Sequence, residues 1–195
     1  MTDILQLADV FSARAQEVME QSQVVEAWEA IGAKVNLVGS LSMGLLMKHR
    51  DFDFHIYTPV LDPAQSFKAV GKICANPRIS RMEYRNLADT DEHCLEFHAW
   101  YLDEMDEEWQ IDMIQILQGS TYDGYFEHVA ERIRTVLTPE TRRTILELKY
   151  AAPDGTHIMG IEYYHAVIGH GVRTWDEFEA WRTANPANGI VDWCP

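Results

Sequence analysis

The stretch 38–54 constrains this chain more than any other, because it places a Gly39-Ser40 turn shortly before the strand-like segment Asp51-Phe-Asp53-Phe. Side chains alternate across a strand, so Asp51 and Asp53 share one face while the phenylalanines occupy the other. Adjacent carboxylates repel each other unless a cation lies between them, and Mg²⁺ is commonly held by one or two carboxylates plus substrate phosphates. The backbone N–H groups at the start of a helix favour a phosphate. The stretch therefore predicts a phosphate-binding turn close to a metal-binding pair.

The order of these residues is also typical of a known group of proteins. Gly39-Ser40, a spacer of ten residues and then Asp51-Phe-Asp53 between apolar residues resembles the signature of the DNA polymerase beta-like nucleotidyltransferase superfamily. More narrowly, it resembles the small bacterial members related to lincosamide and aminoglycoside nucleotidyltransferases. Many of those relatives have a second Gly or a Trp-Ala pair after the first Gly, where this chain has Ser40-Leu-Ser. The motif covers about a tenth of the chain.

This resemblance implies a fold and an activity. The expected fold is α+β, with a small mixed sheet flanked by helices and a further helical region at the C-terminal side. The expected reaction is Mg²⁺-dependent transfer of a nucleoside monophosphate from a nucleoside triphosphate, such as ATP, to a hydroxyl of a small-molecule acceptor. The resemblance also implies a third carboxylate on a later strand, beside Asp51 and Asp53.

Asp112 is the candidate for that third carboxylate. It lies in the middle of a strand-like apolar segment, Gln-Ile-Asp112-Met-Ile-Gln-Ile. A carboxylate there is costly to bury unless it is paired or bound to a metal, so the alternatives are a catalytic or metal-binding role and a structural salt bridge. The acidic residues of the preceding turn, Asp103, Asp106 and Glu108, are expected to be solvated surface charges instead.

The resemblance assigns roles to these residues. Asp51, Asp53 and Asp112 are the predicted catalytic residues and metal ligands, and three carboxylates are compatible with a two-metal site. By the same resemblance, Gly39 and Ser40 are the predicted nucleotide-binding residues. Ser42, which offers a second hydroxyl, and Arg50, which precedes the Asp pair, are further nucleotide-binding candidates by position, and the alternative for Arg50 is a solvated charge on a loop.

Two further groups of residues have open interpretations. Glu96 and His98 share one face of their strand, so they either line the acceptor pocket or form a cross-strand polar pair. Tyr163 and Tyr164, next to His165, either form a base-stacking wall or pack in the core.

The hydrophobic pattern divides the chain into two parts. Residues 1–120 alternate between helical and strand-like periods, which predicts a nucleotidyltransferase-like αβ domain with an N-terminal helix. Residues 121–195 have helical periods and predict a helical region packed against it. The three strands that precede residue 120 are joined by short polar turns, which favours an antiparallel meander. Helices are predicted at 2–31, with a break near 21–23, and at 41–47, 63–74, 124–137, 139–151, 156–168 and 175–183, and strands at 35–38, 51–58, 79–86, 93–101 and 109–117.

Charge and cysteine content limit the partners and the compartment. The formal net charge of −15 predicts a surface that repels nucleic acid, whose binding needs Lys and Arg to neutralise phosphates. We therefore expect a small acceptor rather than a nucleic acid. Cys74, Cys94 and Cys194 match no zinc pattern, no apolar run reaches membrane-spanning length, and no signal peptide is apparent. These features predict a cytoplasmic protein with reduced thiols and no membrane partner.

Two other functions compete with the transferase. Haloacid dehalogenase phosphatases also use an Asp-x-Asp pair, but theirs ends an early strand and is followed by a Thr or Val where this chain has His55. The second alternative is a non-catalytic nucleotide-binding protein or a regulatory, antitoxin-like partner with the same fold. The presence of all three carboxylates favours the enzyme.

Overall fold

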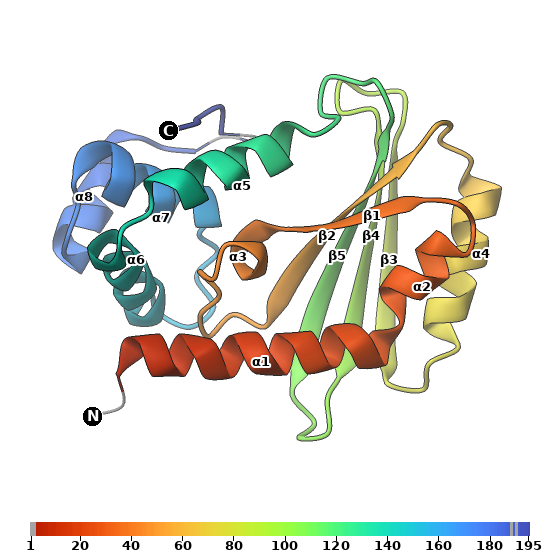
Figure 1. Ribbon diagram of the computed structural model, residues 1–195, viewed down its shortest axis with the longest axis horizontal. Coiled ribbons are helices and arrows are strands. Elements are labelled where there is room, and N and C mark those ends of the chain that lie inside the picture. The colour runs from red at the N-terminus through yellow and green to blue at the C-terminus, as the bar shows by residue number, and fades with distance from the viewer. Residues whose placement is uncertain (1–2, 188, 190) are drawn as a thin grey trace.

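The computed structural model describes residues 3–187, 189 and 191–195. Within this part of the chain, a mixed five-stranded sheet is flanked by helices on one face and joined to a helical region at one end, which confirms the α+β class (Figure 1). The strands are β1 (Lys34–Val38), β2 (Asp51–Thr58), β3 (Ile79–Leu87), β4 (Cys94–Leu102) and β5 (Glu108–Leu117). The helices are α1 (Ile4–Ser22), α2 (Val24–Glu29), α3 (Gly39–Ser42), α4 (Pro63–Cys74), α5 (Tyr125–Val136), α6 (Pro139–Ala151), α7 (Gly160–Tyr164), which continues as a π-helical segment (His165–Gly169), and α8 (Trp175–Ala184).

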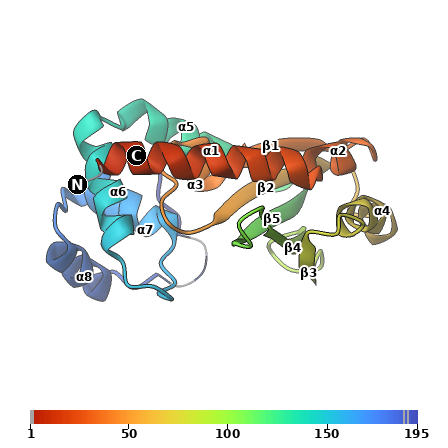
Figure 2. The same cartoon turned by 90° about the horizontal axis from the view of Figure 1, so that it is seen from below.

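The sheet has the strand order β1-β2-β5-β4-β3. Strands β3, β4 and β5 form the predicted antiparallel meander, and β2 pairs in parallel with β5 at the centre. The alternation along β2 explains its place there, because Phe52, Phe54 and Ile56 are fully buried while Asp51 and Asp53 lie on the opposite face. The first face packs against α1, α2 and α4, which lie along the sheet in Figure 2.

A second apolar cluster holds the helical region together. It joins α5, α6, α7 and α8 through residues such as Ile133, Ile145 and Phe178. Met43 and Leu45, from the loop between α3 and β2, belong to this second cluster rather than to the sheet core. A loop of the part before residue 120 therefore supplies core residues to the helical part after it. The division into two domains near residue 120 stays a prediction.

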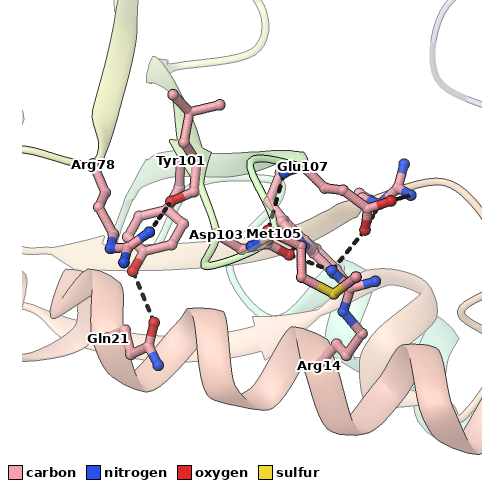
Figure 3. A network of polar contacts seen from close by, with 10 residues as sticks. Arg14, Gln21, Arg78, Tyr101, Asp103, Met105 and Glu107 are labelled. Carbon is pink, nitrogen blue, oxygen red and sulfur yellow. Dashed lines mark hydrogen bonds and ion pairs between the residues drawn. The ribbon is translucent and has the colours of Figure 1, made fainter.

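The turn between β4 and β5 is fastened to α1 by polar contacts (Figure 3). Asp103 accepts hydrogen bonds from the backbone N–H groups of Met105 and Glu107 at 2.8 and 3.0 Å, and from Trp109 Nε1 at 3.0 Å. Arg14 of α1 pairs with both Asp103 and Glu107. The prediction that Asp103 is a solvated charge is therefore wrong, since the residue is only 6% exposed and closes its own turn.

Two predicted helices have different bounds in the structure. The helix expected at 41–47 is a single turn that begins at Gly39, because Gly44 has φ +67° and stops the helical path. The helix expected from Thr156 begins at Gly160, where the Glu162 carboxylate accepts a hydrogen bond from Met159 N at 2.8 Å. At the N-terminus, Asp3 caps α1, and the predicted start at residue 2 lies outside the described residues.

Across the described part of the chain, every helix is too short or too polar to cross a lipid bilayer.

Candidate active site

The parallel pairing of β2 with β5 brings the three predicted carboxylates together. Asp53 lies directly opposite Asp112 in the register, and Asp51 lies opposite Gln110. Because neighbouring strands are separated by about 4.8 Å, Asp53 and Asp112 project side by side from the same face of the sheet. This face is the one that α1, α2 and α4 leave uncovered.

The carboxylates are crowded in a buried place. Burial, together with the charges of Asp51 and Asp112, raises the pKa of Asp53 to about 7. Burial also raises the pKa of Asp51, although the charge of Lys149 opposes that shift. A group of acids that resist ionisation together is stabilised by a cation, and three carboxylates supply the hard oxygen ligands that Mg²⁺ requires. The donor set therefore fits a divalent metal ion.

Gly39 is required for the position of Asp53. A Cβ atom on residue 39 would lie 1.8 Å from Asp53 Oδ2, far inside van der Waals contact. Gly39 also has φ +65°, a backbone conformation that other residues adopt at a cost. Gly39 and Ser40 line the same cavity as Asp51 and Asp53, so the turn and the acidic pair belong to one site.

Two of the predicted nucleotide-binding side chains are engaged elsewhere. Ser42 Oγ donates a hydrogen bond to the carbonyl oxygen of Gly39 at 2.9 Å and does not line the cavity. Arg50 forms a two-pronged contact with Glu107, with Nε 3.1 Å from Oε2, and does not line the cavity either. A guanidinium matches a carboxylate in this geometry, which explains why Arg50 turns away from the Asp pair.

Asp112 both belongs to the acidic group and forms the alternative salt bridge. Its Oδ1 atom accepts from His98 Nδ1 at 2.6 Å and from Gln110 Nε2 at 2.8 Å. The hydrogen bond to Asp112 raises the pKa of His98. Both contacts use Oδ1, and no hydrogen bond between described residues uses Oδ2. Asp112 lies opposite Asp53 in the register but does not itself line the cavity. Glu96 Oε2 lies 3.7 Å from His98 Nε2 and also pairs with Arg85 on the neighbouring strand β3. Glu96 and His98 thus match the predicted alternative of a polar pair across strands.

A cavity of about 540 Å³ opens in front of Asp51 and Asp53. Its floor is the polar end of β2 with the turn at Gly39, and one wall is the apolar side of α5, from Phe126 to Ile133. The opposite wall consists of residues 156–161 and Tyr164. A volume of this size is within the range of small-molecule sites, and it combines a charged end with an apolar end.

Lys149 is a functional candidate that the sequence interpretation missed. It lies on the buried side of α6, lines the cavity, and donates a hydrogen bond to the carbonyl oxygen of Leu45 at 2.9 Å. Burial lowers the pKa of Lys149 to about 8, against the pull of the charges on Asp51 and Asp53. A lysine four residues after Ile145, on an otherwise apolar helix face, was the available signal.

Tyr164 is the second missed candidate. Its hydroxyl is buried, lines the cavity region and has no hydrogen-bond partner among the described residues. Tyr163, by contrast, stacks on Phe178 with ring centroids 4.5 Å apart, so the two neighbouring tyrosines have different environments. The core-packing interpretation fits Tyr163, whereas Tyr164 presents an unpaired polar atom beside the site.

Another group of potential metal ligands lies away from this cavity. Among the described residues, Glu92, Cys94 and Glu96 have ligand atoms within 4.8 Å of one another. Burial raises the pKa of the Cys94 thiol to about 12, with further contributions from the two glutamates. A thiol that resists ionisation is a poor ligand for a soft metal, so this group does not compete with the carboxylates of β2 and β5 as a candidate.

Comparisons with known proteins give a likeness of fold. No protein-family model and no curated protein sequence matches the chain. Among solved structures, the Cid1 poly(U) polymerase with MgGTP bound superposes with a TM-score of 0.59 at 13% identity, over 80% of this chain and 49% of that one. The GLD-2/RNP-8 complex superposes with 0.55 at 9% identity, over 96% and 69% of the two chains. The polymerase core of TRAMP, an RNA surveillance complex, gives 0.51 at 11%, over 91% and 59%.

The chain spans about half the length of the Cid1 polymerase that it resembles. At these identities the likeness concerns the arrangement of helices and strands alone. From its topology and its agreement with these solved polymerases, the chain has the nucleotidyltransferase fold.

Proposed function

We propose that this protein is a Mg²⁺-dependent nucleotidyltransferase, which moves a nucleoside monophosphate from a nucleoside triphosphate, such as ATP, to a hydroxyl of a small-molecule acceptor. One observation carries the proposal: Asp53 is buried between Asp51 and Asp112 at the charged end of a cavity, with its pKa raised to about 7. A divalent cation would relieve the repulsion among these carboxylates, and the bound cation would in turn attract an anionic ligand such as a triphosphate.

The site offers a division of roles. Asp51 and Asp53 are the proposed ligands of Mg²⁺, with Asp112 as a ligand for a second ion or as the base for the acceptor hydroxyl. A bound Mg²⁺ would supply charge neutralisation at the triphosphate and would make a hydroxyl more acidic. The positively charged ammonium group of Lys149 would attract the negative charge of a triphosphate at the same end of the cavity. Gly39 and Ser40 offer backbone N–H groups and a hydroxyl to the phosphates.

The choice of acceptor rests on the charges beside the site. The open face of the sheet continues from Asp112 to β4 and β3, where Arg81 pairs with Glu83 and Arg85 pairs with Glu96. Those arginines are partly neutralised, and the chain as a whole carries a formal charge of −15. A nucleic-acid backbone needs a track of uncompensated positive charge, so this face favours a small acceptor.

An RNA end is the second candidate acceptor. The solved structures that share the fold include a poly(U) polymerase and a polymerase core from an RNA surveillance complex. This chain spans 49% and 59% of those two chains, so each of them contains residues that have no counterpart here. A non-catalytic nucleotide-binding or regulatory role remains the alternative from another class, and it predicts triphosphate binding without turnover.

The cysteines are unpaired, which fits the cytoplasmic location that we propose.

The test uses triphosphates labelled at either the α- or the γ-phosphate. Purified protein is incubated with Mg²⁺ and a panel of acceptors that contains small polyhydroxyl compounds and short RNAs with a free 3′ hydroxyl. The proposal predicts that α-label, and not γ-label, moves to a small acceptor, and that Asp53→Asn abolishes the transfer. Label on RNA alone would replace the small acceptor by the second candidate. Transfer of γ-label would indicate a kinase reaction and overturn the proposal.

A further inference from the structure

His55 is a polar residue in the cavity that the proposed chemistry leaves without a role. It follows Asp53 by two positions on β2, so its side chain projects from the same face as the carboxylates. The residue is 7% exposed and lines the cavity. Its ring meets Phe126 of α5 edge-on, with centroids 5.0 Å apart. His55 therefore lies between the charged end and the apolar wall.

A partly buried carboxylate lies beside the Nδ1 atom of the His55 ring. Glu127 Oε2 is 3.6 Å from His55 Nδ1, and Nδ1 is buried without a hydrogen-bond partner among the described residues. Glu127 also accepts from Tyr57 Oη at 2.7 and 2.8 Å and from Asn36 Nδ2 at 2.9 Å. Burial raises the pKa of Glu127, but the interactions with His55, Asn36 and Tyr57 outweigh it and lower the pKa to about 2, so Glu127 is an anion at neutral pH.

The anion determines which nitrogen of the ring is available. The carboxylate beside Nδ1 occupies that side of the ring, so Nε2 is the nitrogen left to form a hydrogen bond with a ligand. Nδ1 is enclosed, so the ring edge that reaches the cavity is the Nε2 side. Because Tyr57 and Asn36 fix Glu127 from two strands, the orientation of His55 is built into the junction of β1, β2 and α5.

The shape of the cavity indicates which part of a nucleotide arrives at this point. On the proposed function, the phosphates occupy the end at Asp51, Asp53 and Lys149, and the base occupies the apolar end along α5 and Met159. The sugar connects the two. A strand rises about 3.3 Å per residue, which places His55 roughly 7 Å beyond Asp53 along β2, about the length of a sugar.

We propose that His55 forms a hydrogen bond with a ribose hydroxyl of the bound triphosphate through Nε2, and that Glu127 is the residue that positions it. His55 thereby selects ribonucleotides over the deoxynucleotide that lacks the hydroxyl. The inference rests on the proposed function, since it concerns the sugar of that nucleotide. It assigns no proton transfer to His55.

The experiment measures affinities of non-hydrolysable ribonucleoside triphosphates and of their 2′-deoxy and 3′-deoxy counterparts by calorimetry, with Mg²⁺ present. The wild-type protein should bind the ribonucleotide about 3- to 10-fold more tightly than one of the two deoxy forms, which corresponds to one hydrogen bond. His55→Phe keeps a ring of similar bulk and should reduce this ratio to about one, mainly by weakening the ribonucleotide. Glu127→Gln should reduce the ratio in part, and a merely structural role would change all affinities together.

Phe126→Leu is the matched control, because it alters the same wall without removing a hydrogen-bonding group. It should change the ribo and deoxy affinities by the same factor.

Should His55→Phe fail to fold, His55→Leu and the wild-type ratio itself remain informative. A wild-type ratio of one for both deoxy forms overturns the inference while triphosphate binding, and thus the proposed function, stands. A ratio unchanged in a folded His55 variant also overturns it. Absence of triphosphate binding by the wild type would overturn the proposed function and this inference together.

Discussion

The Asp53 carboxylate occupies the space in which a side chain on residue 39 would lie. A Cβ atom at Gly39 would approach Asp53 Oδ2 to 1.8 Å. The turn after β1 and the central carboxylate on β2 are therefore parts of one steric arrangement, and β1 pairs with β2 so that Val38 lies opposite Asp53. The glycine of the motif serves the acidic group as well as the turn.

Gly39→Ala should consequently abolish metal-dependent triphosphate binding and destabilise the fold. The methyl group displaces the Asp53 carboxylate, and the backbone at φ +65° adds strain of about 1 kcal/mol or more. Gly32→Ala is the control, because Gly32 has φ +85° but open space around its Cβ position. It should cost a similar strain energy and leave binding intact. Equal loss of binding in both variants would show that the effect of residue 39 is general destabilisation.

The raised pKa of Asp53 makes a prediction about stability in the absence of metal. Burial raises this pKa to about 7, so between the ordinary value of 3.8 and pH 7 the folded state holds a proton that the unfolded state releases. Wild-type stability in EDTA should therefore fall as pH rises through this window. Asp53→Asn removes the titrating group. The free energy of unfolding of this variant, relative to that of the wild type, should therefore rise by roughly 2 kcal/mol between pH 5 and pH 8. Urea titrations at the two pH values measure this, and a constant difference would contradict it.

Asp112→Asn should separate binding from chemistry. Asp51 and Asp53 remain to hold a metal with the triphosphate, whereas the base or the second metal ligand is lost. We expect triphosphate affinity to change by less than about threefold and nucleotidyl transfer to fall at least about 100-fold. Asp91→Asn, in an exposed turn, is the control and should retain both. Full transfer activity in the Asp112 variant would leave Asp112 with the salt bridge to His98 as its only role.

Much of this arrangement was predictable from the sequence because it depends on local periodicity. The alternation in Asp51-Phe-Asp53-Phe determined which face of β2 is apolar, and the single charge within an apolar strand identified Asp112. Residues that act through distant contacts were not predictable in that way. Lys149 reaches the cavity because α6 packs its apolar side against the loop at Leu45, and Arg50 leaves it because Glu107 is closer.

The stability of the β4–β5 turn depends on a residue that looked like surface charge. Hydrogen bonds from Trp109, from two backbone N–H groups and from Arg14 outweigh burial and lower the pKa of Asp103 to about 2. Asp103→Asn should therefore cost about 1–3 kcal/mol at pH 7. The contribution is present above the ordinary pKa of 3.8 and is lost as pH falls toward 2, so the cost should shrink in acid. Urea titrations at pH 7 and pH 3 check this, and triphosphate affinity should not change.

The proposed function requires that a triphosphate bind through a metal held by Asp51 and Asp53. Calorimetric titration with non-hydrolysable forms of the four ribonucleoside triphosphates, in Mg²⁺ and in EDTA, measures it on the wild type and on Asp53→Asn. We predict binding of at least one triphosphate to the wild type in Mg²⁺, and none in EDTA or by the variant. Binding that is independent of Mg²⁺ and of Asp53, or no binding of any triphosphate, would contradict the account.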